Sequence, residues 1–243
     1  MMTTPAADDA HLRAAADRAL ELVRPGDKLG LGTGHAASVF ITALGERVHR
    51  DGLSIVGVAT SEATARQAHE LGIALADLDE QGELDVMVDG ADEVAPNLDL
   101  VKGRGGAFVR ERIVAAASRR QVIIVGADKL VAALGERGGI PIEVIPMAVA
   151  LVTRSLERLD MRAVVRRIDA RPFVTSNSNL IIDAAPAAPI ADPRDARALH
   201  RTIRDITGVV DTGLFLGTAE RVLVGHPDGR VETLVRAAPA FDG

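Results

Sequence analysis

The chain has 243 residues, of which 47% are hydrophobic and 26% charged, and its net charge is −6. This length and composition predict a globular protein with room for one large domain, or for one large and one small domain. The negative charge and an aromatic content of only 2%, all of it phenylalanine, argue against a nucleic-acid-binding surface, which needs cations and stacking rings. Cysteine is absent and the six histidines have no metal-ligand spacing, so we expect neither disulfides nor a bound metal.

The sequence also argues against a membrane protein. No apolar run approaches the roughly 20 residues that cross a bilayer, and the start MMTTPAADDAH does not resemble a signal peptide. We therefore expect a cytoplasmic protein with no membrane partner.

The N-terminal part is predicted to form a helix, a strand, a glycine turn and a second helix. Residues 8–23 show an amphipathic helical period, and Pro25-Gly26 ends that helix. The strand 28–32 leads into the turn Thr33-Gly34-His35-Ala36, after which a helix runs to about residue 49. This arrangement aims backbone N–H groups at an anion, although glycine turns also occur for packing alone. The spacing matches neither a dinucleotide fingerprint nor a Walker A loop, so a small phosphate ester fits better than a nucleotide.

A second strand and helix follow the same pattern. Residues 53–59 are an apolar strand, and Thr60-Ser61-Glu62 begins a helix that ends at Leu71-Gly72. The hydroxyl groups at the start of this helix either cap it or bind a second polar group of a ligand. Residues 73–76 are a candidate for a further short strand.

The stretch from Leu84 to Arg112 carries the densest set of charged residues. A strand ends at Asp89-Gly90-Ala91-Asp92, a glycine loop surrounds Lys102, and a helix that begins near Ala107 carries Glu111 in its first turns. Ligands of doubly wound sheets bind where strands end in loops, so these acids and this lysine could converge on one small ligand. The alternative is that DGAD is only a turn and that the later charges form a solvated helix face.

The remaining elements predict two domains. Another strand, 121–125, is followed by a loop with Lys129, and the repeated strand–helix order predicts a parallel sheet with helices on both faces. Residues 138–141 resemble a linker, and a β-α-β-β-α order then predicts a small α+β domain of ferredoxin-like type. Segments 214–215, 221–225 and 231–235 are expected to return to the first sheet. The predicted domains are therefore 1–136 with 210–243, and 137–209.

Six segments together carry a resemblance to a known family. In chain order they are GLGTG, ATSEAT, DVMVDGADEV, LVKGRGGAFVRERI, PIEVIPMA and VTSNSNLIID. They resemble type A ribose-5-phosphate isomerase, and the resemblance extends from the first helix to Gly229. It implies an α/β fold, with a Rossmann-like domain and a small α+β domain, in a homodimer or homotetramer. It also implies an enzyme of the pentose phosphate pathway that interconverts ribose 5-phosphate and ribulose 5-phosphate without metal or cofactor.

The reaction moves a proton between C2 and C1 through an enediolate, so it needs a base and donors for the developing oxyanion. By resemblance, Glu111 is the base, and Lys102 stabilises the oxyanion. Asp89 and Asp92 hold sugar hydroxyl groups and assist ring opening.

The resemblance also implies a set of substrate-binding residues. Lys129 and the turn of Thr33, Gly34, His35 and Ala36 correspond to the phosphate site. The backbone around the catalytic residues is expected to contact the sugar, at Gly90, Ala91, Gly103, Arg104 and Gly105.

Several positions depart from the family pattern. The phosphate turn is usually T-G-S-T but has His35 and Ala36 here, and Arg104 interrupts the usual K-G-G-G. A bound phosphate dianion could protonate the imidazole of His35, or the imidazole could point to solvent while the backbone holds the phosphate. The four catalytic residues are intact, so aldose–ketose isomerisation is the main hypothesis. The alternatives are an isomerase or deaminase of another phosphorylated sugar, and a non-catalytic sugar-phosphate-binding protein.

Overall fold

The computed structural model describes residues 9–237. Residues 1–8 and 238–243 lie outside the described residues. Most of the N-terminal stretch that was predicted not to be a signal peptide is therefore not described. Within the described part of the chain, no helix is both long and apolar enough to cross a membrane.

The helices and strands follow the predicted order with a few additions. The helices are α1 (Ala10–Leu20), α2 (His35–Asp51), α3 (Glu62–Glu70), α4 (Leu78–Gln81), α5 (Phe108–Ala116), α6 (Val149–Glu157) and α7 (Pro193–Arg204). The strands are β1 (Lys28–Leu31), β2 (Val56–Ala59), β3 (Val86–Asp89), β4 (Glu93–Val94), β5 (Leu100–Val101), β6 (Gln121–Gly126), β7 (Ile140–Val144), β8 (Met161–Val165), β9 (Arg167–Ile168), β10 (Arg171–Pro172), β11 (Leu180–Pro186), β12 (Val209–Thr212), β13 (Leu214–Phe215), β14 (Arg221–Gly225) and β15 (Val231–Val235). Two 3-10 turns, Ala127–Lys129 and Pro146–Ala148, precede Leu130 and α6.

The chain divides into two compact units. Among the described residues, the first comprises 9–90, 110–129 and 218–237, and the second comprises 91–109 and 130–217. These units differ from the predicted domains, chiefly because 91–109 belongs to the second unit. The reason is backbone pairing, since β4 and β5 pair with each other and β5 pairs with β13, in a three-stranded sheet of their own.

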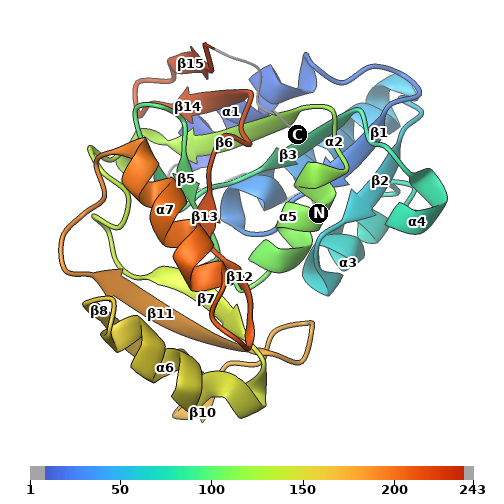
Figure 1. Cartoon of the computed structure of the whole chain (residues 1–243). Helices are drawn as coiled ribbons and strands as arrows, with labels where there is room; N and C mark the ends of the chain where they lie inside the picture. The colour runs from blue at the N-terminus through green and yellow to red at the C-terminus, as the bar shows by residue number, and fades with distance from the viewer. Residues whose placement is uncertain (1–8, 238–243) are drawn as a thin grey trace. The chain divides into compact units, whose positions relative to one another are not determined.

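The first unit is built on a six-stranded sheet of order β15-β14-β6-β3-β1-β2 (Figure 1). Neighbouring strands are parallel from β14 to β2, and only β15 is antiparallel, at the edge. The helices α1 and α2 bury Leu12 and Phe40 in the core on one face of the sheet. The helix α5 packs Val114 with Met87 in a second core cluster. The predicted parallel sheet with helices on both faces is confirmed.

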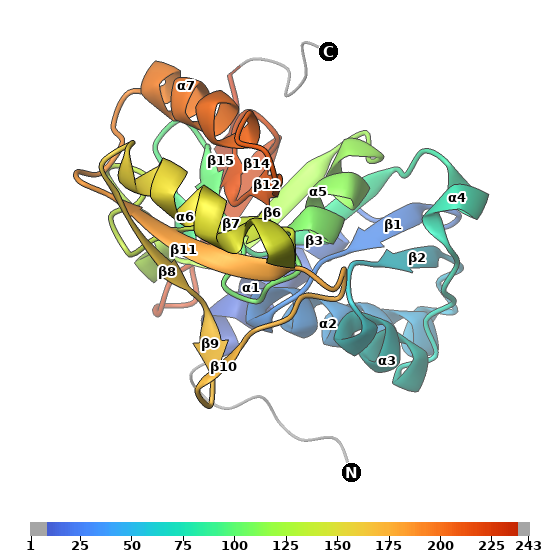
Figure 2. The same cartoon turned by 60° about the horizontal axis from the view of Figure 1, so that its bottom comes forward.

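The second unit contains a four-stranded antiparallel sheet of order β12-β7-β11-β8 (Figure 2). Its chain order is β7, α6, β8, β11, α7, β12, which is the ferredoxin-like arrangement. The helices bury Val152 and Leu156 of α6, and Ala196 and Ile203 of α7, in the core of this unit. The predicted small α+β fold is therefore confirmed.

Three local predictions were wrong, each where a segment was too short to show a period. Leu214-Phe215 was expected in the first sheet but forms β13 beside β5. Ile140-Pro141 was expected in a linker but begins β7, where Pro141 lies opposite Asp183. Residues 73–76 form no strand, because only Leu75 bridges to Gly57.

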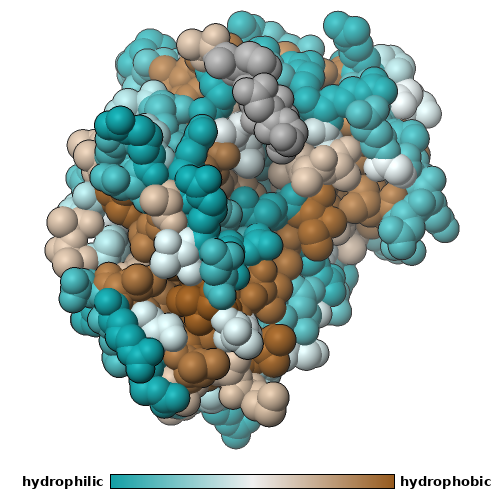
Figure 3. Space-filling model, viewed as in Figure 1, coloured by the Kyte–Doolittle hydropathy of each residue, from teal (hydrophilic) through white to brown (hydrophobic). Residues whose placement is uncertain are grey.

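The second unit also exposes apolar side chains near the end of β7 and on α6. Ile145 is 48% exposed, Met147 96% and Leu151 44%. The space-filling view shows apolar surface over this part of the unit, among hydrophilic residues (Figure 3). An apolar surface of this kind is typical of a contact with another protein chain.

Candidate active site

The turn after β1 is fixed by a cluster of hydroxyl groups within the first unit. The Thr33 Oγ1 atom lies 2.7 Å from Thr60 Oγ1, 2.9 Å from Ser61 Oγ and 3.2 Å from Thr64 Oγ1. Ser61 is also the N-cap of α3, because its Oγ accepts a hydrogen bond from the Thr64 N–H. The cluster joins the turn to the start of α3, so both helix capping and turn stabilisation use these hydroxyls. Gly34, with φ +106°, then leads into α2.

The Asp89 carboxylate lies at the carboxyl end of β3, fully buried. Its Oδ1 accepts a 2.7 Å hydrogen bond from the Gly90 N–H. A Cβ atom on Gly32 would stand 2.1 Å from that Oδ1, so only glycine at residue 32 leaves space for the carboxylate. Gly32 was not among the predicted site residues. The alternation of Gly30, Gly32 and Gly34 was the available signal, because a strand residue without a side chain often marks a close approach.

Glu111 lies in the first turn of α5 and is only 3% exposed. It belongs with Asp89 to the first unit, whereas Asp92 and Lys102 belong to the second. The alternative that the later charges form a solvated helix face is wrong for Glu111. A carboxylate is rarely buried so far unless it is used or well bonded, because burial removes its hydration.

Asp92 is tied to the glycine loop of the second unit. Its N–H donates to the Val101 carbonyl at 2.9 Å, and its Oδ2 accepts a 2.9 Å hydrogen bond from the Arg104 N–H. Asp92 and the loop after Lys102 were both predicted to belong to the site. This hydrogen bond holds them together.

Lys102 follows β5 and is only 3% exposed. Its N–H donates to the Gly213 carbonyl at 2.9 Å, and a Cβ on Gly213 would stand 2.2 Å from the Lys102 oxygen. Its ammonium lies 5.6 Å from the ring centroid of Phe215, within the range of a cation–π contact. The β5–β13 pairing therefore fixes both the backbone and the side chain of this lysine.

Two other acidic residues of the stretch from Leu84 to Arg112 accept hydrogen bonds from backbone N–H groups, which is a structural role. Glu93 accepts hydrogen bonds from the Gly135 N–H at 2.6 Å and the Arg137 N–H at 2.8 Å. Asp99 accepts one from the Gly217 N–H at 2.8 Å. These contacts separate structural carboxylates from the candidate catalytic pair Asp89 and Asp92.

The basic side chains that are candidates for binding the phosphate also contact other groups of the protein. The His35 Nε2 lies 2.6 Å from Asp9 Oδ1, and its side chain is 66% exposed. Lys129 Nζ lies 2.9 Å from the Asp128 carboxylate, and Arg104 Nη2 donates to the Arg137 carbonyl at 2.9 Å. The structure brings the turn close to the end of β3, since a Cβ on Gly90 would lie 3.4 Å from the Ala36 Cβ.

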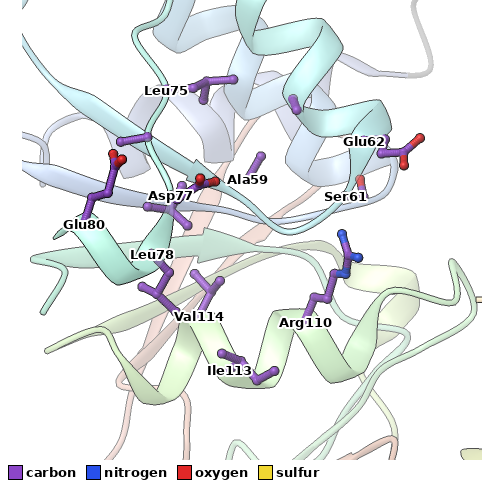
Figure 4. A pocket seen from close by; sticks show the side chains of 13 residues that line it. Ala59, Ser61, Glu62, Leu75, Asp77, Leu78, Glu80, Arg110, Ile113 and Val114 are labelled. Atoms are coloured by element: carbon purple, nitrogen blue, oxygen red, sulfur yellow. The ribbon is translucent and has the colours of Figure 1, made fainter. Parts of the chain in front are cut away.

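A cavity of about 530 Å³ opens in the first unit, between β2, α3, α4 and α5. Its walls include Leu75, Ile113 and Val114, and Arg110 points toward the start of α3 (Figure 4). Glu62, Asp77 and Glu80 also line it, and Glu111 does not. Three carboxylates beside one guanidinium disfavour a sugar phosphate, so we do not assign the substrate to this cavity.

Within residues 9–237, no three histidine, cysteine or acidic side chains are grouped so that they could hold a metal ion.

Comparison with known proteins identifies the family. A family model described as ribose 5-phosphate isomerase A (phosphoriboisomerase A) matches residues 56–229. The ribose-5-phosphate isomerase A of Deinococcus radiodurans is 46% identical over 229 residues, which is 94% of this chain and 99% of the relative. That of Thermomicrobium roseum is 49% identical over 217 residues, which is 88% of this chain and 90% of the relative.

Solved structures agree with this match. The ribose 5-phosphate isomerase A of Methanocaldococcus jannaschii superposes with a TM-score of 0.87 at 39% identity, over 95% of this chain and 100% of that one. A D-ribose-5-phosphate isomerase in complex with phospho-erythronic acid gives a TM-score of 0.88 at 38% identity, over 94% and 99% of the two chains. Fold and matches together define an isomerase. The chain belongs to the ribose-5-phosphate isomerase A family, as its motifs predicted.

Proposed function

We propose that the chain interconverts ribose 5-phosphate and ribulose 5-phosphate through an enediolate. The observation that carries the proposal is the set Asp89, Asp92, Lys102 and Glu111, which is complete in a chain similar to its relatives over nearly their whole length. Three of the four are at least 97% buried, with exposed fractions of 0% for Asp89 and 3% for Lys102 and Glu111. Burial of this kind excludes water, which strengthens electrostatic interactions with a reacting group.

Glu111 is the proposed base. Its carboxylate takes the proton from C2 of the open-chain aldose and returns it to C1, while the proton of the C2 hydroxyl group passes to O1, which leaves the ketose. The reverse reaction uses the same carboxylate on the C1 proton. The rigid first turn of a helix is a suitable support for a base that must reach two adjacent carbons.

Lys102 is the proposed partner of the developing oxyanion. As charge moves from the C–H bond to the carbonyl oxygen, a nearby ammonium and backbone N–H groups stabilise it without first having to be oriented. The backbone hydrogen bond to Gly213 and the ring of Phe215 hold this ammonium.

Asp89 and Asp92 are the proposed contacts to sugar hydroxyl groups, and they also assist the opening of the sugar ring. One carboxylate can accept the proton of the C1 hydroxyl group as the bond between C1 and the ring oxygen breaks, and the resulting carboxyl group then gives that proton to the ring oxygen. Both are oriented by backbone N–H groups, from Gly90 and from Arg104 respectively.

The turn Thr33–Ala36, with Lys129, is the proposed phosphate site. Hydroxyl contacts within the turn support its conformation. Backbone N–H groups at the start of α2 are suitable donors to phosphate oxygens, because the start of a helix favours negative charge. This use of backbone explains why the turn tolerates His35 and Ala36.

A cytoplasmic homodimer or homotetramer is part of the same proposal. The exposed Ile145, Met147 and Leu151 offer an apolar surface that a second copy could cover. Light scattering coupled to size-exclusion chromatography measures the assembly, and a monomer at micromolar concentration would contradict it.

The test is an isomerase assay on ribose 5-phosphate and on other pentose and hexose phosphates. Glu111→Gln keeps the shape of the side chain but removes the proton acceptor, so we expect kcat to fall at least about 100-fold with little change in KM. Glu157→Gln, the same change on the exposed end of α6, is the matched control and should keep full activity. Near-normal turnover by Glu111→Gln would remove Glu111 from the mechanism. Turnover of only another sugar phosphate would correct the substrate.

A further inference from the structure

Arg166 is the most heavily bonded side chain near the glycine loop of the second unit. It lies between β8 and β9, where its N–H donates to the Ile181 carbonyl at 2.8 Å and its carbonyl accepts from the Phe173 N–H at 2.9 Å. Its side chain is only 14% exposed. Both its backbone and its side chain are therefore held in place.

The guanidinium of Arg166 connects two parts of the second unit. Its Nε and Nη2 donate to the two carboxylate oxygens of Asp183 at 2.9 and 2.5 Å. Its Nη1 donates to the Gly103 carbonyl at 2.7 Å and to the Arg104 carbonyl at 2.9 Å. Four of its five N–H donors are thus in use, in a planar fork that a lysine cannot reproduce.

The two carbonyls that Arg166 binds determine where two N–H groups point. In a trans peptide the C=O and N–H of one peptide unit point in opposite directions. The Gly103 carbonyl shares its peptide with the Arg104 N–H, which donates to Asp92 Oδ2 at 2.9 Å. The Arg104 carbonyl shares its peptide with the Gly105 N–H, which therefore points away from Arg166.

Glycine and aromatic packing fix the same loop from its other sides. A Cβ on Gly103 would stand 2.6 Å from the Phe108 ring, and a Cβ on Gly106 would stand 2.4 Å from the Phe173 ring. Phe173 also lies under the guanidinium of Arg166, with 5.9 Å between Cζ and the ring centroid. The loop after Lys102 is therefore held at its carbonyls by one cation and at its glycines by two rings.

We propose that Arg166 is a positioning residue for the isomerisation. By binding the carbonyls of Gly103 and Arg104, it orients the Arg104 N–H toward Asp92 and directs the Gly105 N–H away from itself, as a donor to the enediolate oxygen. A cation on a carbonyl also polarises its peptide, which makes the N–H of that peptide a stronger donor. Asp183 supports this arrangement by orienting the guanidinium. The inference rests on the proposed function, because it assigns the loop N–H groups to that reaction.

The experiment compares Arg166→Lys with the wild type in the isomerase assay. Lysine keeps the charge but cannot bind both carbonyls and Asp183 together, so we expect kcat to fall about 10- to 100-fold, with KM for ribose 5-phosphate within about threefold. Phospho-erythronic acid carries a planar carboxylate, which resembles the planar enediolate more than the sugar does. Its inhibition constant should therefore rise by the same factor as kcat/KM falls.

A matched control separates positioning from stability. Arg47 Nη1 likewise donates to two backbone carbonyls, those of Leu20 and Val23, at 2.5 and 3.3 Å in the first unit. Arg47→Lys should lower Tm but leave kcat and the inhibition constant unchanged. Asp183→Asn leaves Arg166 in place and should lower kcat only a few-fold. This variant replaces Arg166→Lys in the test if Arg166→Lys folds poorly.

Chemical rescue provides a second readout. Methylguanidinium ions at millimolar concentration should restore part of kcat to Arg166→Ala, without raising the activity of the wild type or of Glu111→Gln.

The outcomes distinguish the inference from the function on which it rests. If the wild type is active, Glu111→Gln is inactive and the Arg166→Lys enzyme keeps full kcat below its Tm, only the inference falls. An equal loss of kcat in the Arg47→Lys enzyme would also overturn it. If the wild type does not isomerise ribose 5-phosphate, or Glu111→Gln retains activity, the proposed function falls and this inference falls with it.

Discussion

The residues proposed to act on the reacting carbons and those proposed to hold the phosphate differ in how the protein surrounds them. Asp89, Lys102 and Glu111 are between 0% and 3% exposed. The side chains of His35 and Lys129 are 66% and 33% exposed. A buried charge depends on every neighbour, because desolvation is compensated only by well-placed groups. An exposed charge can be exchanged at less cost, and His35 is the residue of this set that was expected to depart from the family pattern.

After Glu111→Gln, the largest effect we expect comes from filling the space beside Asp89. Gly32→Ala places a methyl group 2.1 Å from Asp89 Oδ1, so the carboxylate must move. We expect kcat to fall at least about tenfold, and the protein to lose about 1–3 kcal/mol of stability. Gly57→Ala is the matched control, since its methyl group would crowd aliphatic side chains, with the Leu31 Cδ1 at 2.6 Å and the Leu75 Cδ2 at 3.2 Å. It should lower Tm and keep kcat, and a fully active Gly32→Ala enzyme would show that Asp89 tolerates displacement.

Removing the Lys129 charge should affect binding and leave the chemistry intact. A hydrogen bond to a charged group contributes about 1.5–3 kcal/mol, so we expect Lys129→Gln to raise KM for ribose 5-phosphate about tenfold, with kcat within about threefold. Steady-state kinetics check this split. Lys28→Gln, at a lysine that donates to the Gln81 carbonyl, is the control and should change neither constant. A fall in kcat alone would place Lys129 at the reacting carbons.

The altered turn should have a smaller effect. An exposed ion pair contributes about 0.2–1 kcal/mol, so a protonated His35 would tighten phosphate binding less than about fivefold. His35→Ser with Ala36→Thr should therefore change KM for ribose 5-phosphate less than about fivefold and leave kcat unchanged. Asp9→Asn tests whether the 2.6 Å contact to Asp9 competes with the phosphate. Equal KM values for the wild type and the double variant would assign phosphate binding to the backbone.

The smallest effect concerns a partly buried ion pair outside the site. The hydrogen bond from Arg13 holds the pKa of Glu46 below its ordinary value, and this pair links α1 to α2. A lowered folded-state pKa stabilises the fold above the unfolded-state pKa, near 4.3, and this stability is lost as pH falls through the folded-state pKa. Thermal unfolding of Glu46→Gln should therefore show a loss of stability at pH 7, of less than about 1 kcal/mol, that shrinks as the pH falls through the folded-state pKa of Glu46. A loss that stays constant in acid would point to packing.

Much of the first unit could be predicted because its strands are buried on both faces. All six residues of β6 are buried, which gives a continuous apolar run bounded by polar residues. The two-residue strands β4, β5 and β13 could not be predicted, because two residues show no period and β5 pairs with β13 more than a hundred positions away. The boundary of the second unit depends on that pairing.

The identities of the candidate site residues could be predicted from motifs, but their surroundings could not. Nothing near His35 in the sequence indicates Asp9 as its partner, and nothing near Arg104 indicates the Arg137 carbonyl. Both contacts depend on where distant segments meet. One compositional signal was available, since only Lys28, Lys102 and Lys129 are lysines among 28 lysines and arginines. A lysine kept in an arginine-rich chain suggests a need for a compact ammonium, because the two side chains are not interchangeable.

The pairing of β5 with β13 also affects when an active enzyme can appear during synthesis. The Lys102 backbone is bonded to Gly213, which is made 111 residues later. At about 5–20 residues per second, this interval lasts roughly 5 to 20 s. A nascent chain that already contains Asp89, Asp92, Lys102 and Glu111 therefore has its lysine unsupported until the last strands emerge. Catalytic competence is thus tied to completion of translation, and a chain released before residue 213 should carry all four reactive groups and no activity.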